Sequence, residues 1–481
     1  MRDEKEKSVS NEVIKTINPT TGEMLNTYES QCWQDLELVL DRASQSQGLW
    51  SRTTIDERAS VLTAVAKAFS SKREELARLI TQEMGKPIVE SRAEIDKCAV
   101  TCAFYAENAT AFLSPEHTET RADDSWVSYE PLGTILAVMP WNFPFWQAVR
   151  FLAPALVAGN ATILKHSPNT SGCALALCDI LIDAGLPSGL FAAILVAEAE
   201  VPSVTQRLIE DDRIAAVTAT GSERAGAAIG AAAGRSIKKS VLELGGSDPF
   251  VVLDDADLSA TVALAVRSRF MNAGQSCIAA KRFIIADSIF DLFSELFSAA
   301  VKELKVGDPL EELTEIGPMA RADLVDVIDR QVAASVALGA KVLVGGHRIK
   351  GPGNFYAPTV LSDVTLEMAV CEEETFGPVA VLLRATDDND AVNIANATRW
   401  GLGASVWTTD LCRGRLVAAQ LNSGAVFINA IVVSDPRLPF GGIRKSGYGR
   451  ELSSQGIREF VNVRTWWLED RPARVAVAPT E

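Results

Sequence analysis

The sequence predicts an α/β protein with two doubly wound, mainly parallel sheets and a small additional sheet. From Thr134 onward, short apolar runs alternate with helical stretches. The ELGGSDP run (243–249) interrupts this alternation, which then continues after it. Strands that alternate with helices pair in parallel through right-handed crossovers, so each block predicts one sheet. Two further strand-like segments, SWVSYE (125–130) and FVNVRTWW (460–467), lie outside both blocks and indicate the additional sheet.

The residues before the first block predict helices. Apolar positions recur every three or four residues among charged ones in Gln34–Ala68 and Arg73–Asn108. This spacing is typical of amphipathic helices. We therefore expect a helical lead-in before the first sheet.

Each block predicts a series of strands separated by helices. In the first block, the expected strands are TILAVM (134–139), ATILK (161–165), FAAILVA (191–197), AAVTAT (215–220) and SVLEL (240–244), with helices at 149–158, up to 184, and at 222–234. In the second block, they are PFVVL (249–253), RFIIA (282–286), KVLVG (341–345), VAVLLR (379–384), ASVWTT (404–409) and AVFINA (425–430), with helices at 258–271 and 289–304. The ELGGSDP run is expected to link the two sheets.

The two lone strand segments are expected to pair with each other or with another subunit. An isolated strand is marginally stable in water and exposes unpaired backbone groups. We therefore predict a small bridging sheet that another copy of the chain completes.

Composition and charge exclude several classes of function. The 481 residues carry 46 Lys and Arg against 62 Asp and Glu, a formal net charge of −16, which disfavours nucleic acid and anionic membranes as partners. The first residues, MRDEKEKSVS, lack the apolar core of a signal peptide, and Gly133–Val149 contains two prolines. Eight scattered cysteines and three histidines show no metal-ligand spacing. We expect a cytoplasmic protein with reduced thiols, no membrane span and no metal.

Two side chains are candidates for nucleophile and base. Cys277 lies in NAGQSCIAA, among small and polar residues that permit an approachable turn. Glu243 ends an apolar strand-like run, where partial burial would raise its pKa toward the range useful to a general base. The alternatives are a buried structural cysteine and a hydrogen-bonded glutamate at a strand end.

Two other segments could bind an oxyanion and a phosphate. Asn142 lies between two prolines in PWNFPFW, where a rigid amide can donate to a developing oxyanion. In TGSERAG, which begins at Thr220, a strand leads into a helix whose free N–H groups suit a pyrophosphate, and Gly226 permits close packing. The alternatives are a proline-bracketed core loop and a tightly packed Ala/Gly helix.

The combination of these motifs resembles the aldehyde dehydrogenase superfamily. PWNFP, KHSP, TGSERAG, ELGG, GQSC, EEETFGPV and PFGGIRKSGYGRE occur in the order and approximate spacing of that family, from about Ile17 to Trp467. PLGTILAVMPWNFPFWQ and the KHSPN run are most similar to those of bacterial succinate-semialdehyde dehydrogenases. The resemblance implies an aldehyde dehydrogenase-like fold and an oxidoreductase.

The resemblance assigns three catalytic roles. Cys277 matches the nucleophile that attacks the aldehyde carbon. Asn142 and the backbone N–H of Cys277 match the oxyanion donors. Glu243 matches the base that activates water to release the acid, and because relatives that transfer the acyl group to coenzyme A typically lack this glutamate, hydrolysis is expected here.

The resemblance also implies a binding site for NAD or NADP. Pro168 stands where NAD-selective relatives often carry a glutamate that binds the ribose, so both cofactors are admissible, with a slight preference for NAD. The residues expected to bind the cofactor are Trp141, Lys165, Ser167, Pro168, Thr220, Gly221, Ser222, Gly226, Leu244, Glu374 and Phe376.

The expected substrate is succinate semialdehyde or a similar short ω-carboxy aldehyde. Arg150 matches an arginine that binds the distal carboxylate in succinate-semialdehyde enzymes, and Ser434 could add a hydroxyl. The alternative for Arg150 is a surface or interdomain ion pair. Met271 replaces a second arginine that some relatives carry, so another aliphatic or aromatic aldehyde stays open. Two other classes also stay open: a cysteine-dependent hydrolase or transferase without redox chemistry, and a non-catalytic scaffold.

The motif positions also predict domain boundaries. Residues 1–117 and 136–243 are expected to form the dinucleotide-binding domain, with its helical lead-in, and 244–440 the catalytic domain. Residues 118–135 and 455–470 are expected to form the bridging strands. By analogy with the family, the protein is expected to be a homodimer or a homotetramer.

Overall fold

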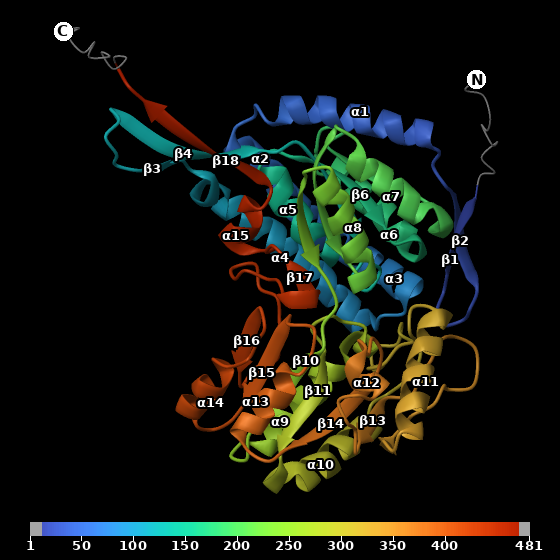
Figure 1. Ribbon diagram of the computed structural model, residues 1–481. Helices are drawn as coiled ribbons and strands as arrows, with labels where there is room; N and C mark the ends of the chain where they lie inside the picture. Colours follow the sequence, from blue (N-terminus) through green and yellow to red (C-terminus); the bar gives the residue numbers. More distant parts are fainter. Residues whose placement is uncertain (1–11, 471–481) are drawn as a thin grey trace, which may run out of the picture.

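The computed structural model describes residues 12–470 and contains two large sheets stacked end to end (Figure 1). The first sheet has the strand order β17-β9-β8-β5-β6-β7, in which only β17 is antiparallel. Its strands are β5 (Thr134–Met139), β6 (Ala161–His166), β7 (Phe191–Ile194), β8 (Ile214–Thr220), β9 (Lys239–Glu243) and β17 (Gly447–Tyr448). The order reverses between β5 and β8, as the doubly wound prediction requires.

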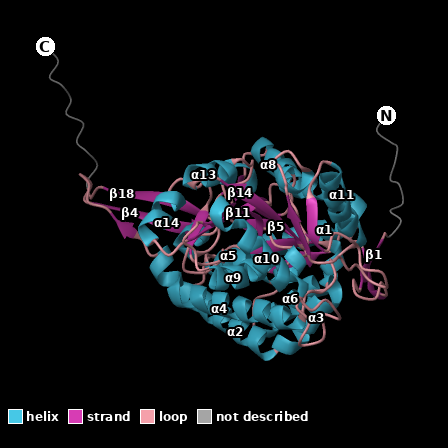
Figure 2. Cartoon of the chain, turned by 90° about the horizontal axis from the view of Figure 1, so that it is seen from below, coloured by secondary structure: helices cyan, strands magenta, loops and turns pink. Residues whose placement is uncertain are grey.

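Helices cover the first sheet on both faces (Figures 1 and 2). The helices that contact its strands are α1 (Trp33–Trp50), α5 (Trp146–Val157), α6 (Ser171–Asp183), α7 (Val201–Glu210) and α8 (Glu223–Arg235). An outer layer packs mainly on these helices and consists of α2 (Ile55–Ser71), α3 (Arg73–Met84), α4 (Ile88–Leu113) and α15 (Ser453–Arg458). The predicted lead-in is confirmed as helical, and its two segments divide into four helices. One break is at Gly85, whose φ of +81° ends α3, and α4 begins directly after Pro87.

The second sheet has the order β12-β13-β14-β11-β10-β15-β16, with only β12 antiparallel. Its strands are β10 (Asp248–Val252), β11 (Ala280–Ala286), β12 (Lys341–Val344), β13 (Thr359–Ser362), β14 (Val379–Ala385), β15 (Gly403–Trp407) and β16 (Ala425–Ile428). Its helices are α9 (Leu258–Phe270), α10 (Phe290–Lys302), α11 (Ala322–Ala337), α12 (Ala369–Glu372), α13 (Asp388–Asn396) and α14 (Leu411–Ala418). The α/β fold class predicted from the sequence is confirmed.

The core of the second sheet lies on both of its faces. Val251 and Ile284 belong to one apolar cluster, whereas Phe250 and Phe283 belong to another. Alternate residues of a strand point to opposite faces of the sheet, so the continuous apolar runs of β10 and β11 are buried on both faces. The central strands are therefore rigid platforms for the residues at their ends.

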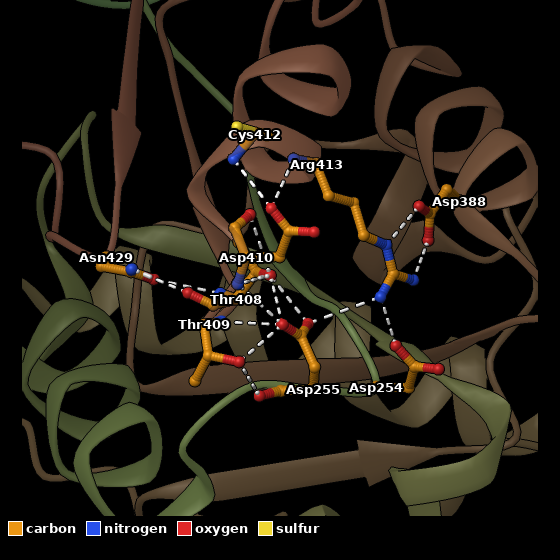
Figure 3. A network of polar contacts seen from close by, with 9 residues as sticks. All are labelled: Asp254, Asp255, Asp388, Thr408, Thr409, Asp410, Cys412, Arg413 and Asn429. Carbon is orange, nitrogen blue, oxygen red and sulfur yellow. Dashed lines mark hydrogen bonds and ion pairs between the residues drawn. The ribbon is translucent and has the colours of Figure 1, made fainter.

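A network of polar contacts closes the carboxyl end of β10 and β15 (Figure 3). The Asp255 carboxylate accepts hydrogen bonds from the Thr408 hydroxyl at 2.7 Å and the Asp410 N–H at 2.8 Å. Arg413 pairs with Asp254 and Asp388. Although burial opposes it, the hydrogen bonds to Asp255 lower its pKa to about 2.

Two small sheets lie at the sides of the molecule (Figure 2). The order of one is β18-β4-β3, from β18 (Val461–Leu468), β4 (Asp124–Pro131) and β3 (Glu116–His117). The predicted lone strands thus pair with each other, in antiparallel register. The other is the hairpin β1 (Val13–Ile17) and β2 (Met24–Glu29), which was not predicted. Within residues 12–470, no helix is both long and apolar enough to cross a membrane.

Candidate active site

Predicted site residues lie at the carboxyl end of the first sheet and at the amino end of the second, and hydrogen bonds join the two edges there. Asn142 follows β5, and Glu243 is the last residue of β9. Cys277 precedes β11 in the second sheet. Ser247 is the only residue that separates the double glycine 245–246 from β10, so the chain passes directly from one sheet edge to the other.

A cavity of about 660 Å³ opens beside the Cys277 thiol. Its walls are mostly apolar, and its lining includes the predicted substrate residues Arg150 and Ser434. Asn142 and Glu243 are not among the lining residues. The other residues around it include Glu90, Lys97, Phe143, Trp146, Arg267, Met271, Ile278, Val432 and Phe440.

The loop before Cys277 has a strained backbone. Asn272, Ala273 and Gly274 have φ of +54°, +51° and +72°, three consecutive left-handed residues. A side chain at Gly274 would overlap the carbonyl of Gly377, so glycine is required there. Such strain persists only where the surroundings enforce it, and it is concentrated at functional sites.

Two neighbouring groups hold the strained loop. The Asn272 N–H donates to the Glu90 carboxylate at 2.8 Å, and the Asn272 amide donates to the carbonyl of Asn142 at 2.9 Å. Burial raises the pKa of Glu90 to about 7, against the opposing effect of Lys86. Glu90 was not predicted as a site residue, because it lies on a helix with no motif around it.

Cys277 rests as a thiol at neutral pH. Its side chain is half-buried, and burial raises its pKa to about 11 although Arg150 and Lys281 oppose the shift. The ammonium of Lys281 donates to the backbone carbonyl of Cys277 at 2.9 Å, which fixes the turn. A base or a bound ligand must therefore help to remove the thiol proton.

The Asn142 amide is held against the nucleophile loop. Its side chain is buried, and its Nδ2 donates to the carbonyl of Gln275 at 3.0 Å. The amide therefore contacts the backbone two residues before Cys277, and the prolines on either side of Asn142 restrict the segment that carries it.

Glu243 is buried in a separate, charged environment. Only 2% of it is exposed, and neither of its carboxylate oxygens has a hydrogen-bond partner in the described residues. Burial first, and then the nearby Glu451, raise its pKa well above the usual value. Its carboxylate faces Gly441, where a Cβ would lie 2.6 Å from Oε1. Within the described residues, no hydrogen bond joins the carboxylate to the Cys277 thiol.

Arg150 forms a buried ion pair with Glu451. Both side chains are 2% exposed, and the guanidinium also lies 4.7 Å from the centre of the Phe440 ring. The ion-pair alternative for Arg150 is thus present, while the residue also lines the cavity. Glu451 was not singled out from the sequence, because a glutamate in a glycine-rich run gives no sign of its partner.

The expected adenosine end of the cofactor site lies after β6. Lys165 is buried, which lowers its pKa to about 8. Ser167 and Pro168 follow, and the Ser167 hydroxyl donates to the Asn169 side chain at 2.7 Å. Lys165 has no ion-pair partner within residues 12–470, so its charge is available to a ligand oxygen.

The α8 N-terminus fits a phosphate group. Ser222 caps the helix, and its hydroxyl accepts from the Ala225 N–H at 3.3 Å. Thr220 and Gly221 lead into it, and the space beside Gly221 is open. A side chain at Gly226 would overlap Leu244, so the small residue lets α8 pack against the end of the sheet. The helix dipole favours an anion here.

The expected nicotinamide end contains Trp141, Phe376 and Glu374. The two aromatic rings meet edge to face with centroids 5.7 Å apart. The Glu374 carboxylate accepts from the Gly246 N–H at 3.0 Å, and burial raises its pKa. Among the described residues, the set predicted for the cofactor therefore lies along one edge of the first sheet and the facing loop.

Lys97 is a second cation of the cavity that the sequence analysis missed. Its Nζ donates to the Ser434 hydroxyl at 2.6 Å and lies 4.2 Å from the centre of a Trp146 ring. Burial, followed by the positive charge of Arg150, lowers its pKa to about 8. In sequence it is one lysine among the charges of an amphipathic helix, and nothing distinguishes it from a solvated one.

Comparison with known proteins supports the protein family that the sequence motifs resemble. The profile of the aldehyde dehydrogenase family matches residues 5–466. Succinate semialdehyde dehydrogenase [NAD(P)+] Sad of Escherichia coli (strain K12) is 49% identical over 454 residues, 94% of this chain and 97% of that protein. Succinate-semialdehyde dehydrogenase [NADP(+)] 1 of Mycobacterium bovis is 46% identical over 458 residues, 95% and 99% of the two chains.

A solved structure agrees in fold. The crystal structure of succinic semialdehyde dehydrogenase from Streptococcus pyogenes in complex with NADP+ has a TM-score of 0.92 at 36% identity, covering 95% of this chain and 100% of that chain. The chain belongs to the aldehyde dehydrogenase family. It is an aldehyde-oxidising enzyme, and the resemblance inferred from the sequence is confirmed.

Proposed function

We propose that this chain oxidises succinate semialdehyde to succinate with NAD or NADP as the electron acceptor. The observation that carries the proposal is the cavity in which the Cys277 thiol shares mostly apolar walls with cationic side chains. A four-carbon aldehyde with a terminal carboxylate matches both properties. The relatives at 46–49% identity, which are named succinate-semialdehyde dehydrogenases, support the same substrate.

In the proposed reaction, the Cys277 thiol gives its proton to solvent in the cavity, and the sulfur bonds to the aldehyde carbon. The carbonyl π bond breaks, and the oxygen becomes an anion that the Asn142 amide and the Cys277 N–H stabilise. A hydride then leaves the carbon and the carbonyl re-forms as a thioester, so the aldehyde is oxidised by two electrons. Reaction with water breaks the carbon–sulfur bond and releases the acid and the free thiol.

Glu243 is proposed to remove the proton from that water. Its oxygens have no hydrogen bonds within residues 12–470, so no hydrogen bond has to break when the carboxylate turns toward the thioester. Because its pKa is raised, protonation inactivates it as a base at a higher pH than it would an ordinary glutamate. The hydrolysis step should therefore become faster as the pH rises.

A bound nicotinamide would accept the hydride. Trp141, Glu374 and Phe376 are proposed to surround its ribose and ring, and the α8 N-terminus with Ser222 to hold the pyrophosphate. Lys165 would contact the adenosine ribose. Pro168 provides neither a hydrogen-bond acceptor nor a negative charge against a 2′-phosphate, which supports use of both cofactors.

We also propose that the enzyme is a homodimer or homotetramer in the cytoplasm. In β18, Val463 is 58% exposed and Trp467 is 48% exposed, and exposed apolar edge strands tend to pair with another chain. All eight cysteines are free, which fits a reducing compartment. The domain boundaries predicted from the sequence are kept as a proposal. Sedimentation equilibrium measures the subunit number.

The test is a panel of aldehydes with and without a terminal carboxylate, assayed with both cofactors by nicotinamide absorbance. The proposal expects the highest kcat/KM for succinate semialdehyde. A preference for uncharged aliphatic or aromatic aldehydes would replace the substrate. Thioester or ester cleavage that needs no nicotinamide, with no aldehyde oxidation, would favour the hydrolase or transferase alternative, and no turnover at all would favour a scaffold.

A further inference from the structure

We infer that Lys97, with Ser434, binds the distal carboxylate of the aldehyde and determines specificity for it. The inference rests on the proposed function, which it deepens by naming the group that recognises the substrate's charge. It differs from the sequence expectation, in which Arg150 binds the carboxylate and Ser434 adds a hydroxyl.

Lys97 presents its ammonium to the cavity that contains the nucleophile. It lies on α4, and its side chain and that of Cys277 line the same cavity. The Ser434 hydroxyl accepts one of its three protons at 2.6 Å. The aromatic face of Trp146 borders the ammonium and would also cover the methylene chain of a bound substrate.

The two carboxylates whose charges act on Lys97, those of Glu94 and Asp435, are already paired with other cations. Glu94 pairs with the buried Lys86 and accepts the Trp146 N–H at 3.0 Å. Asp435 pairs with Arg437 at 2.6 Å. Within residues 12–470, Lys97 itself has no ion pair, so its charge is uncompensated.

Arg150 differs from Lys97 in this respect. Its charge is matched by Glu451 inside the protein. A carboxylate that approached Arg150 would meet a neutral pair and the nearby Glu243, whereas at Lys97 it would meet a net positive charge in a partly dehydrated site. Coulomb attraction is stronger there than in water, and a hydroxyl partner can share the carboxylate.

Lys97 is also better placed to bind a carboxylate than Arg267, the other cation of the cavity lining that has no ion pair within residues 12–470. Arg267 is exposed, and water competes with any ligand for its guanidinium. Lys97 is half-buried and has a pKa lowered to about 8 by burial, which a bound carboxylate would raise again. The cost of burying the lysine charge is thus recovered when the substrate binds.

The experiment compares Lys97→Met with wild type on two four-carbon aldehydes, succinate semialdehyde and butanal. Lys97→Met should raise KM for succinate semialdehyde by about 30-fold or more, since losing one partner of a partly buried charge pair costs about 2 kcal/mol or more. Butanal KM should change by less than about twofold, because it has no carboxylate for Lys97 to bind. Lys97→Arg should recover part of the loss.

Arg267→Gln is the matched control, because it removes a cation of the same cavity that lies in water. Its KM for succinate semialdehyde should change by less than about threefold. Ser434→Ala, which leaves Lys97 in place, gives a second measurement if Lys97→Met does not fold, and should raise KM for succinate semialdehyde alone by about fivefold. Circular dichroism and NADPH binding monitor the fold.

The outcomes separate the inference from the proposed function. If wild type prefers butanal, the proposed function fails. If wild type prefers succinate semialdehyde but Lys97→Met and Ser434→Ala alter both substrates equally, or neither, the inference is wrong and the proposed function stands. An Arg267→Gln effect as large as that of Lys97→Met would also overturn it, because general electrostatics would then explain the preference.

Discussion

The two large sheets contribute to the site from opposite ends of their strands. In the first sheet, Asn142 and Ser222 follow the carboxyl ends of β5 and β8, at the reversal of strand order where doubly wound sheets usually bind ligands. In the second sheet, Cys277 precedes the amino end of β11, and the carboxyl end is closed by the network of Figure 3. The fold class alone therefore does not determine which edge of a sheet is functional. In this protein, the functional edge of each sheet is the one that faces the other sheet.

The difference extends to how the two edges hold their residues. The first edge uses standard features, such as the Ser222 cap and the glycine packing at the start of α8. The second uses a left-handed backbone at 272–274, held by the Glu90 carboxylate and by the carbonyl of Asn142. Cys277 precedes its strand, so it is not positioned by the regular turn that follows a strand. The strained backbone of the loop positions it instead.

The largest expected effect is on kcat, and it compares a cysteine at the amino edge of the second sheet with one near its carboxyl edge. Cys277→Ala should lower kcat for aldehyde oxidation by about 10⁴-fold or more, because no other cysteine among the described residues lines the cavity. NADPH should still bind, as measured by fluorescence titration. Cys412→Ser, at an exposed thiol on α14, is the control and should retain wild-type turnover. Full activity of the alanine variant would disprove the covalent mechanism.

The next effect tests the base at the end of β9. Glu243→Gln should lower steady-state kcat by about 10²- to 10³-fold, while a rapid burst of NADPH from the first turnover remains. Wild-type kcat should rise with pH, because the raised pKa of Glu243 leaves it protonated at low pH. The glutamine variant should lose this rise. A stopped-flow trace without a burst would assign Glu243 to thiol activation.

A backbone substitution tests the strain in the nucleophile loop. Gly274→Ala should lower the free energy of unfolding by about 2–4 kcal/mol, since a positive φ and a clash with the Gly377 carbonyl act together. Gly339→Ala is the control: its φ is +110°, but the space around it is open, so it should cost about 1 kcal/mol. Urea titration measures both. Equal losses would show that crowding at Gly274 contributes nothing.

The smallest effect concerns the closed edge of the second sheet. The pKa of Asp255 is lowered to about 2, so its contribution to stability is present above the unfolded value near 4 and is lost as the pH falls toward 2. Asp255→Asn should lower Tm at pH 7 by a few degrees and reduce the further decline between pH 4 and pH 2. The kcat at pH 7 should not change. Thermal scans across that range compare the two proteins, and identical curves would remove Asp255 from the account.

Sequence patterns predicted the strands well where burial on both faces of the sheet requires a continuous apolar run. The apolar runs of the central strands are buried on both faces, and they match β5, β8 and β11 closely. The strand β13 is short and follows a proline, and the hairpin β1–β2 is half exposed, so neither has a clear apolar pattern. Such elements depend on the neighbours that they meet.

The candidate site was predictable only where a motif surrounds the residue. Cys277, Asn142 and Glu243 lie in glycine- or proline-rich runs that a family shares. Lys97 lies in an ordinary amphipathic helix, and only its tertiary position beside Trp146 separates it from lysines in water. Charge partners between distant segments are set by packing, which spacing in the sequence does not encode.

The strand β17 has a consequence for the order of folding. It pairs Gly447 with Glu243, so residues about 200 positions apart must meet before the first sheet gains its last strand. A chain emerging from the ribosome holds the β9 edge open until nearly all of the protein has been made, and contacts of such separation form late. Nascent enzyme therefore acquires its enclosed glutamate, and with it the capacity to turn over, only in the final stage of synthesis.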